Sequence, residues 1–302
     1  MEKASFLQEL NRQKVSYLFI AVPFTLFFVF QLAPVIISFF WSFTEFNVVH
    51  APRFVGLANY KNILFNDPLF WKAMRNTVLY VLGVVPIGVC TALLLAVAID
   101  QKIKFKNLFK SIFFLPTVTS IIAVSVVWKW LYAGEKYGLI NYVMIKLGFQ
   151  PIDWLASPTW TLPAIMIMSI WAGVGYSMII FLAGLQTIPH VMYEAADIDG
   201  AGFWRKLFNI TIPLLKPTIV FVTMMSFIFS FQVFEQVYIM TSGQGGIGGV
   251  LDSALTIVAY LYEKGFVRFE MGYASAMAYI IFILIFLLTL LNRRFMKTEV
   301  EY

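Results

Sequence analysis

The sequence predicts an all-α polytopic membrane protein with six transmembrane helices. Of its 302 residues, 60% are hydrophobic and only 13% are charged, and the mean hydropathy is +0.81. Soluble proteins contain about 25% charged residues, and a surface as apolar as this one would expose large adhesive patches to water. Six apolar runs also reach the roughly 20 residues that a helix needs to cross the core of a bilayer.

The first apolar run extends from Tyr17 to Phe40. A signal peptide is the competing interpretation, but its apolar region would be shorter and would end at a small-residue cleavage site, which this run lacks. We therefore expect a membrane anchor. The other five runs cover residues 76–99, 112–132, 161–187, 217–240 and 271–291.

Trp128, Lys129 and Trp130 stand at the end of the third run. We expect them to form an interfacial belt, with the lysine amine reaching toward water. No tandem repeat or low-complexity linker interrupts the chain, so one membrane domain is the simplest partition. That partition has an N-terminal segment at 1–16, a transmembrane domain at 17–291 and a C-terminal tail at 292–302.

Lysine and arginine are distributed unevenly between alternate loops. The termini and the loops after the second and fourth runs carry 13 of these residues, and the remaining loops carry 9. Basic residues close to helix ends favour the cytoplasmic side, so we expect both termini to be cytoplasmic. The loops at 41–75, 133–160 and 241–270 are then external. The net charge of +6 is spread over short loops rather than gathered in one patch, which argues against a nucleic-acid partner.

The segment 189–217 is too polar and too patterned for a simple connector. We expect two short helices that meet at Gly200, because glycine adopts backbone angles that other residues resist. Phe203, Leu207 and Ile210 recur at helical spacing and should form one apolar side of the second helix. Such a segment can dock into a groove on a cytoplasmic partner. The alternative is an amphipathic helix that lies on the lipid surface.

The sequence Glu194-Ala-Ala is followed after three residues by Gly200 and after nine more by Ile210 and Pro213. This spacing resembles the cytoplasmic coupling loop, or EAA motif, of binding-protein-dependent ABC importer permeases. Ile212 stands where that family usually has leucine. The resemblance covers nearly the whole chain and implies the type I permease fold. The order of residues around 54–60 resembles the carbohydrate branch, which includes maltose and glycerol-phosphate importers.

The resemblance implies that a partner ATPase pulls on this loop and switches the permease between its inward and outward openings. The residues that would carry this coupling are Glu194, Ala195, Ala196, Asp199, Gly200, Phe203, Ile210 and Pro213. It also implies a second homologous permease, two ATPase subunits, an extracytoplasmic solute-binding protein and a carbohydrate substrate. The location implied is the cytoplasmic (inner) membrane of a bacterium or archaeon.

Nucleotide chemistry is not expected in this chain, which we regard as a non-catalytic subunit. It contains no G-x-x-x-x-G-K-[ST] sequence, so ATP and Mg should bind the partner ATPases and no cofactor should bind here. The run Gly243–Gly248 matches G-x-G-x-x-G, but it follows a membrane helix rather than a strand, so we expect a flexible external turn. His50 and His190 lack companions at metal-ligand spacing, so no metal site is expected.

Two helix faces are candidates for the substrate path, because polar groups at the bilayer midplane are costly unless they are used. Hydroxyl groups can hydrogen-bond a sugar, and aromatic rings can stack on its apolar face. The equivalent faces line the sugar site in maltose-type importers, although the family site is richer in asparagine. The candidates are Ser169, Ala172, Gly173, Tyr176, Ser226, Phe229, Ser230 and Val233. The alternative role for such small and hydroxyl residues is helix–helix packing.

Several alternatives remain open from the sequence. Within the class, the substrate could be another small polar solute such as a glycerol phosphoester. A phosphate should attract buried basic residues, and no predicted helix centre contains one, which favours a neutral sugar. A passive channel or an intramembrane enzyme would belong to a different class, but neither an ion-filter pattern nor a catalytic pair is found. Glu235 lies toward the outer end of the fifth run, where a gate or interface role is favoured over ligand binding.

Overall fold

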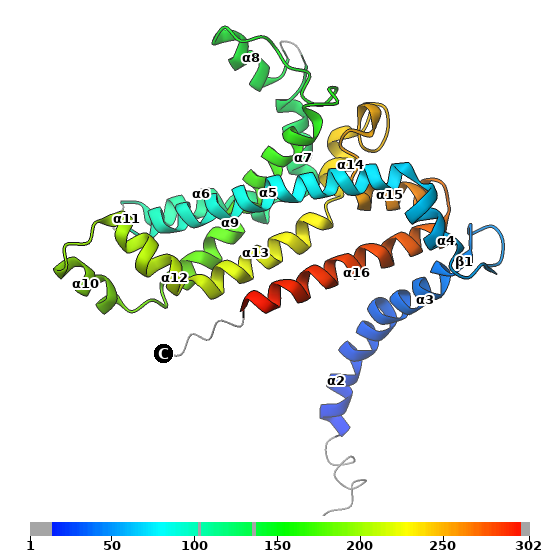
Figure 1. Ribbon diagram of the computed structural model, residues 1–302, viewed down its shortest axis with the longest axis horizontal. Coiled ribbons are helices and arrows are strands. Elements are labelled where there is room, and N and C mark those ends of the chain that lie inside the picture. The colour runs from blue at the N-terminus through cyan, green and yellow to red at the C-terminus, as the bar shows by residue number, and fades with distance from the viewer. Residues whose placement is uncertain (1–13, 102–103, 135–136, 297–302) are drawn as a thin grey trace, which may run out of the picture. The chain divides into compact units, whose positions relative to one another are not determined.

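The computed structural model describes residues 14–101, 104–134 and 137–296, which are almost wholly helical (Figure 1). The segments 1–13 and 297–302, which belong to the predicted N-terminal segment and tail, lie outside the described residues. The chain divides into two compact units. The first takes in the described residues up to Ile63 together with Lys264–Ile280, and the second takes in Leu64–Glu263 together with the described residues from Ile281 onward.

The first unit begins with one long helical run, Lys14–Ser42, which contains the predicted helix at 17–40. The run contains a π-helical turn at Phe28–Leu32, shortly before Pro34, which has no backbone N–H to donate to the preceding turn. No residue of the first segment is buried, as suits a surface that lipid covers. The elements are α2 (Lys14–Phe27), η1 (Phe28–Leu32), α3 (Ala33–Ser42), β1 (Thr44–Glu45), β2 (Arg53–Phe54), α4 (Ala58–Lys61), η2 (Asn62–Asn66), which continues into the second unit, η5 (Glu263–Val267) and the start of α16 (Met271–Met296).

The predicted external loop at 41–75 is therefore structured rather than irregular. β1 and β2 pair antiparallel, with Thr44 opposite Phe54. Asn59 Nδ2 donates to the carbonyl oxygens of Ser42 (3.0 Å) and Thr44 (2.9 Å), which fixes the hairpin to the end of α3.

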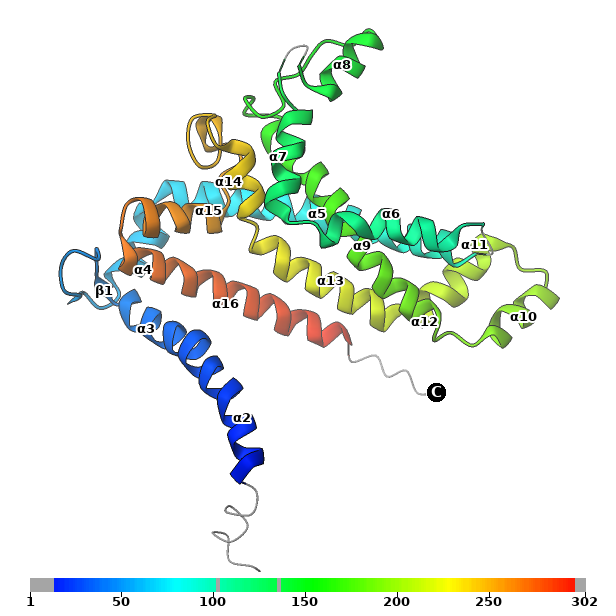
Figure 2. The same cartoon turned by 180° about the vertical axis from the view of Figure 1, so that it is seen from behind.

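The second unit contains the remaining elements, and three of its helices run side by side along its length (Figures 1 and 2). These are α5, α9 and α13, and α6 packs against α9. The elements are α5 (Pro68–Asp100), α6 (Lys106–Val118), α7 (Ile121–Leu131), α8 (Leu139–Lys146), α9 (Thr161–Leu185), α10 (His190–Ile198), α11 (Phe203–Lys206), η3 (Leu207–Thr211), α12 (Ile212–Leu214), α13 (Lys216–Phe231), α14 (Glu235–Thr241), η4 (Val250–Asp252) and α15 (Ile257–Tyr262), with the later part of α16.

α5 begins eight residues before the predicted run, because the chain supplies a strong start signal. The side chain of Asp67 accepts from the backbone N–H of Leu69 (3.0 Å) and Phe70 (3.1 Å), and Pro68 occupies the first helical position. Buried apolar side chains of α5, α9 and α13, among them Met178 and Phe181, form one continuous core. This core holds the three helices in register.

Two of the predicted spans are broken rather than continuous, which corrects the expectation for 112–132 and 217–240. Four helices are long and apolar enough to cross a membrane, and the number rises to six if each of two bent pairs is one span. These pairs are α6 with α7, and the helical run Phe203–Leu214 with α13, which bends by 70°. α6 and α7 meet at 98°. Thr119 explains the break. In a continuing α-helix its N–H would donate to Leu115 O, but here the Thr119 hydroxyl donates to that oxygen (3.0 Å). The Thr119 N–H donates instead to Pro116 O (3.3 Å). α13 stops at Phe231 and the chain resumes as α14.

The segment after α7, which the sequence predicts to be external, is organised by one buried amide. Asn141 of α8 is fully buried, and its Nδ2 donates to Ile152 O (2.9 Å) and Ala133 O (3.4 Å). Its Oδ1 accepts from Ile152 N (3.1 Å) and Trp154 Nε1 (3.0 Å). A single side chain therefore closes the segment back on itself.

The interfacial position expected for Lys129 stays a prediction. Its partly exposed amine donates to Ser242 O (2.6 Å) and Ile239 O (3.2 Å) at the end of α14. Trp128 packs against Tyr132 and Trp171 within the protein, whereas Trp130 is exposed as expected.

Candidate translocation cavity and coupling segment

A cavity of about 260 Å³ lies among α5, α6, α9 and α13 in the second unit. The four helices converge there because the shared core holds α5, α9 and α13 together and α6 approaches α9 closely. None of the residues that line the cavity is charged. Its walls carry hydroxyl groups, one amide and aromatic rings, which together can bind a polar, uncharged ligand.

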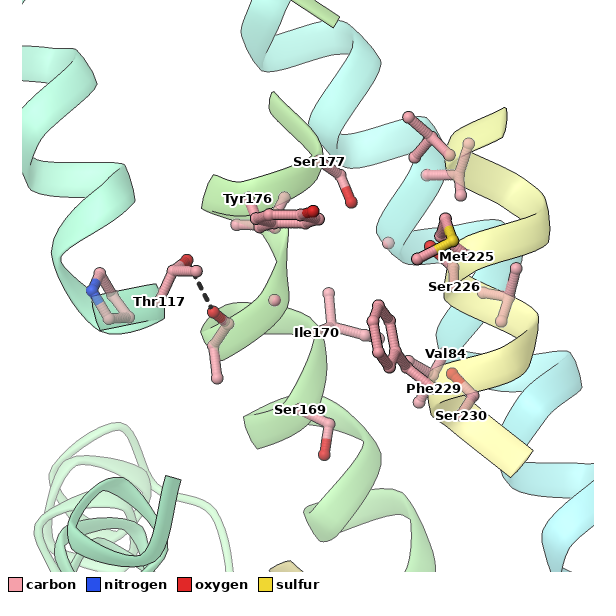
Figure 3. A pocket seen from close by; sticks show the side chains of 18 of the residues that line it. Val84, Thr117, Ser169, Ile170, Tyr176, Ser177, Met225, Ser226, Phe229 and Ser230 are labelled. Atoms are coloured by element: carbon pink, nitrogen blue, oxygen red, sulfur yellow. Dashed lines mark hydrogen bonds between the residues drawn. The ribbon is translucent and has the colours of Figure 1, made fainter. Parts of the chain in front are cut away.

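Aromatic side chains enter the cavity from two helices. Figure 3 shows the ring of Tyr176 from α9 and the ring of Phe229 from α13 extending into the space between these helices. Both side chains are about half exposed, 45% for Tyr176 and 58% for Phe229. Ser226 of α13 and Ser177 of α9 line the same space. The rings offer flat apolar faces and the hydroxyls offer donors and acceptors beside them.

Ser169 has an unused hydroxyl in the cavity wall. It is only 8% exposed, and its Oγ has no hydrogen-bond partner among the described residues. The Tyr80 hydroxyl is a polar neighbour in the same wall. Leaving a buried hydroxyl unpaired costs about 1–3 kcal/mol. A ligand hydroxyl in the cavity would recover that cost.

Two glycines of α9 serve opposite purposes. A Cβ on Gly175 would lie 2.0 Å from Phe113 O, so this glycine allows the backbones of α6 and α9 to meet. Thr117 Oγ1 donates to Ala172 O (3.2 Å) across the same contact. A Cβ on Gly173 would meet no atom within 4 Å, because this position opens onto the cavity.

Seven of the eight predicted substrate-path residues line this one cavity, and the eighth does not. Val233 is 4% exposed, and its carbonyl accepts from Thr256 Oγ1 (3.0 Å), so it packs into the protein beyond the break after α13. Helical spacing predicted its position only while the helix was assumed to continue.

The sequence reasoning missed five polar residues of the wall: Tyr80, Thr117, Thr119, Ser177 and Gln236. Tyr80 of α5 and Thr117 of α6 sit in apolar runs that gave no periodic polar signal, and only the packing of α5 and α6 against α9 brings them to the wall. Ser177 lies on α9 itself and Gln236 on α14. Glu235, beside Gln236, is exposed at the start of α14 and does not line the cavity.

The segment 189–217 forms two helical parts that meet at Gly200, as predicted. Ala201 N bonds Ala196 O (2.8 Å) and Gly200 N bonds Asp197 O (3.1 Å), which is the Schellman pattern of a helix end. Gly200 has φ +71°, the left-handed conformation that this pattern requires. The glycine therefore ends α10 and turns the chain toward α11.

Two contacts tie the halves of this segment together. Lys206 forms an ion pair with Asp197, and the hydroxyls of Tyr193 and Thr211 are 3.0 Å apart. Leu207 is 4% exposed and belongs to the core of the second unit. The segment is consequently anchored to the helices that form the cavity.

The predicted apolar side of the second helical part is only partly correct. Leu207 is buried in the chain's own core and is not available to a partner, and Ala196 is also buried. Ile210 is half-buried, whereas the predicted coupling residues Glu194, Ala195, Asp199, Gly200, Phe203 and Pro213 are exposed. Further apolar side chains, which sequence spacing did not single out, are exposed on the same segment: Val191 (70%), Ile198 (88%), Trp204 (63%) and Phe208 (59%).

The glycine run at 243–248 is a turn that joins α14 to η4. Its glycines adopt positive φ, and Gly248 N bonds the hydroxyl of Thr241 (3.0 Å). Within residues 14–101, 104–134 and 137–296, no three histidine, cysteine, aspartate or glutamate residues gather in a way that could hold a metal ion.

Broken membrane helices around an uncharged polar cavity, with an anchored segment that exposes apolar side chains, are the features of a membrane transport subunit. Residues 12–298 match the family described as the binding-protein-dependent transport system inner membrane component, and the chain belongs to this family. The fold is that of the type I ABC importer permeases.

Two relatives are similar over nearly their full length. The arabinooligosaccharides transport system permease protein AraP of Bacillus subtilis is 36% identical over 286 residues, covering 93% of this chain and 88% of the relative. The lactose transport system permease protein LacF of Rhizobium radiobacter is 37% identical over 281 residues, covering 91% and 92%. A permease chain of a bacterial alginate ABC transporter, solved in complex with a periplasmic protein that holds an alginate pentasaccharide, has a TM-score of 0.82 at 21% identity. It covers 98% of this chain and 99% of that one.

Proposed function

We propose that this chain is a transmembrane permease subunit of an ATP-driven carbohydrate importer and that its substrate crosses through the cavity between α5, α6, α9 and α13. The observation that carries the proposal is the cavity wall, in which hydroxyl groups and the rings of Tyr176 and Phe229 surround an uncharged space. Relatives named for arabinooligosaccharide and lactose transport support the same class of substrate.

The substrate is a neutral sugar or oligosaccharide. A phosphorylated or acidic solute would be held most strongly by arginine or lysine, and no basic residue lines the cavity. Because the wall carries no charge, a neutral solute is held only by hydrogen bonds and ring contacts, and it can leave once these contacts break. A glycerol phosphoester fits this wall poorly.

The importer contains a second homologous permease, two cytoplasmic ATPases that bind ATP and Mg, and an extracytoplasmic solute-binding protein, all at the cytoplasmic membrane. Both termini of this chain are cytoplasmic. The chain itself performs no catalysis. The exposed apolar side chains of the 189–217 segment support docking on an ATPase, since water-exposed Ile198 and Trp204 gain from burial in a groove.

Glu194 supplies the charged contact of this docking surface. It is exposed, and no ion pair to it is found among the described residues, so its carboxylate is available to a basic residue of the partner. Because Leu207 anchors the segment in the core around the cavity, a pull on the segment is transmitted to α9 and α13.

The test is uptake by the purified complex, expressed with its neighbouring genes and reconstituted in liposomes. Neutral oligosaccharides, a uronate oligosaccharide and a glycerol phosphodiester are supplied in turn with internal ATP. We expect ATP-dependent uptake of a neutral sugar, stimulated by the binding protein. Uptake of the charged solutes alone would refute the substrate assignment, and recovery of the chain without an ATPase would refute the transporter proposal.

The coupling role is tested with Glu194→Lys in the same liposomes. Membrane insertion should be unchanged, because the side chain is exposed, whereas sugar uptake and sugar-stimulated ATP hydrolysis should fall together. Glu45→Lys, exposed in β1 and outside this segment, is the matched charge-reversal control and should leave the coupling of uptake to ATP hydrolysis unchanged. Full uptake and stimulation in Glu194→Lys would refute the coupling role.

A further inference from the structure

Two helices are interrupted beside the cavity. α6 ends at Val118 and the chain bends by 98° into α7, while α13 ends at Phe231 and the chain resumes as α14 at Glu235. Residues at both interruptions line the cavity, Thr119 at the first, and Ser230 and Gln236 at the second. The backbone is not held by helical hydrogen bonds at these points, so each outer segment can rotate relative to its inner helix.

The two outer segments are paired with each other. α7 and α14 lie side by side in both views of the molecule and pack together (Figures 1 and 2). Val124 and Ser125 of α7 and Val237 and Met240 of α14 are buried. The pair therefore shares buried side chains, and each of its helices also packs against α9.

Lys129 fastens this pair at one end. Its Nζ, on α7, lies 2.6 Å from Ser242 O, 2.8 Å from Ser242 Oγ and 3.2 Å from Ile239 O. All three acceptors belong to the last turn of α14 or to the residue that follows it. Carbonyl oxygens at a helix end have no partner within the helix and carry partial negative charge, so an ammonium group there is both donor and counter-charge.

Among the described residues that line the hollow beside Lys129, one other carries a charge. Asp153 lines a hollow of about 480 Å³ beside Lys129, together with Gln244, but no ion pair between Asp153 and Lys129 is found among the described residues. The Lys129 amine therefore hydrogen-bonds to the end of α14 and not to a carboxylate. Neither Lys129 nor its acceptors line the cavity.

We propose that Lys129 is a positioning residue that locks α7 to α14, so that the two segments move as one rigid unit about the breaks at Thr119–Ser120 and Gln232–Phe234 during transport. The inference rests on the proposed transport function. In this proposal a residue outside the cavity makes α7 and α14, the two segments of the outer wall, move together. When the ammonium group is removed, α7 and α14 separate, and opening of the cavity is no longer coupled to the ATPases.

The experiment measures distances between spin labels in the reconstituted complex, with and without trapped nucleotide. Cys90, the single cysteine, is first replaced by serine. One label pair joins the two segments through the exposed positions Val127 and Glu235, and a second pair joins α7 to α9 through Val127 and Ile179. We expect the first distance to stay narrow and constant while the second changes between the two states.

Lysine variants then test the fastening itself. Lys129→Met removes all three hydrogen bonds of the ammonium group, so it should broaden the Val127–Glu235 distance and raise sugar-independent ATP hydrolysis by about tenfold or more. Lys129→Arg, which keeps the charge, should restore a narrow distance. Lys146→Met is the matched control, because this exposed lysine contacts only the Tyr142 ring in the described structure.

Three results would overturn the proposal: a Val127–Glu235 distance as variable as the second one, a second distance that never changes, or a Lys129→Met variant that matches the parent. The distance measurements need no transported sugar. A parent complex that takes up no carbohydrate would therefore refute the proposed function while the label data still decide whether Lys129 couples α7 to α14.

Discussion

Replacing Gly175 by alanine tests whether the cavity depends on a backbone contact between α6 and α9. The new Cβ would lie 2.0 Å from Phe113 O, 2.8 Å from the Phe113 carbonyl carbon and 3.0 Å from the Cα of Phe114. These are backbone atoms, so no side-chain rotation relieves the clash and α6 must move away. The Thr117–Ala172 hydrogen bond spans the same contact and would break.

The magnitude follows from three effects. Overpacking of this kind costs about 1–3 kcal/mol, and the lost hydrogen bond costs about 1 kcal/mol. Alanine is favoured over glycine inside a helix by about 1 kcal/mol, which offsets the hydrogen bond. We therefore expect Gly175→Ala to lower the free energy of unfolding by about 1–3 kcal/mol. Gly173→Ala, two positions away, keeps the helix gain of about 1 kcal/mol and meets no atom.

The assay compares the two alanine variants by thermal unfolding of the purified complex at one heating rate, since unfolding of such complexes is commonly irreversible. The unfolding temperature should fall for Gly175→Ala and should stay level or rise for Gly173→Ala. Gly173→Leu should also stay folded, but it should reduce uptake because its side chain enters the cavity. The reasoning is refuted if Gly175→Ala is as stable as the parent or if Gly173→Ala is the more damaging of the pair.

Three further predictions concern other parts of the chain. Ser169→Ala removes an unpaired buried hydroxyl, so the unfolding temperature should stay level or rise while the apparent KM for sugar uptake rises several-fold. Asn141→Ala leaves the part-buried Trp154 Nε1 and N–H of Ile152 without this partner, and it should cost about 1 kcal/mol for each group. Hydrogen exchange should then increase within 137–160 and not in α9. Trp204→Ala removes an exposed ring and should weaken ATPase retention on purification without lowering the stability of the isolated chain.

Each of these predictions has a contradicting outcome. An unchanged KM in Ser169→Ala would mean that no ligand uses this hydroxyl. Uniform exchange across α8 and α9 in Asn141→Ala would mean that the amide does not organise the external segment. Undiminished ATPase recovery with Trp204→Ala would place the docking surface elsewhere on the segment.

The sequence could predict features that depend on local pattern. The length of an apolar run determines whether a helix can cross a bilayer, so the membrane character and the approximate spans followed directly. The turn at Gly200 also followed, because only the residues around it decide whether a helix ends in a left-handed glycine. Spacing along α9 and α13 correctly brought Tyr176 and Phe229 to one cavity, since a regular helix places such residues predictably.

Prediction failed where a helix was interrupted or where the partner was distant in sequence. The hydroxyl of Thr119 competes with the Thr119 N–H for the carbonyl oxygen of Leu115, and a hydropathy profile does not reveal this competition. Val233 left the predicted face because α13 stops two residues earlier. Leu207 appeared available to a partner because its spacing matched that of Phe203, although it packs into the core around the cavity.

The sequence by itself determined that this is a helical membrane protein with a patterned polar segment between membrane helices, because bilayer thickness and helix-end chemistry act on residues that are near neighbours in the chain. Only the tertiary structure decided which polar residues share the cavity, how Gly173 and Gly175 differ, and where the amine of Lys129 goes. Lys129 and Ser242 are 113 positions apart. Contacts of that range depend on how whole helices pack, and packing is set by the shapes of many side chains at once.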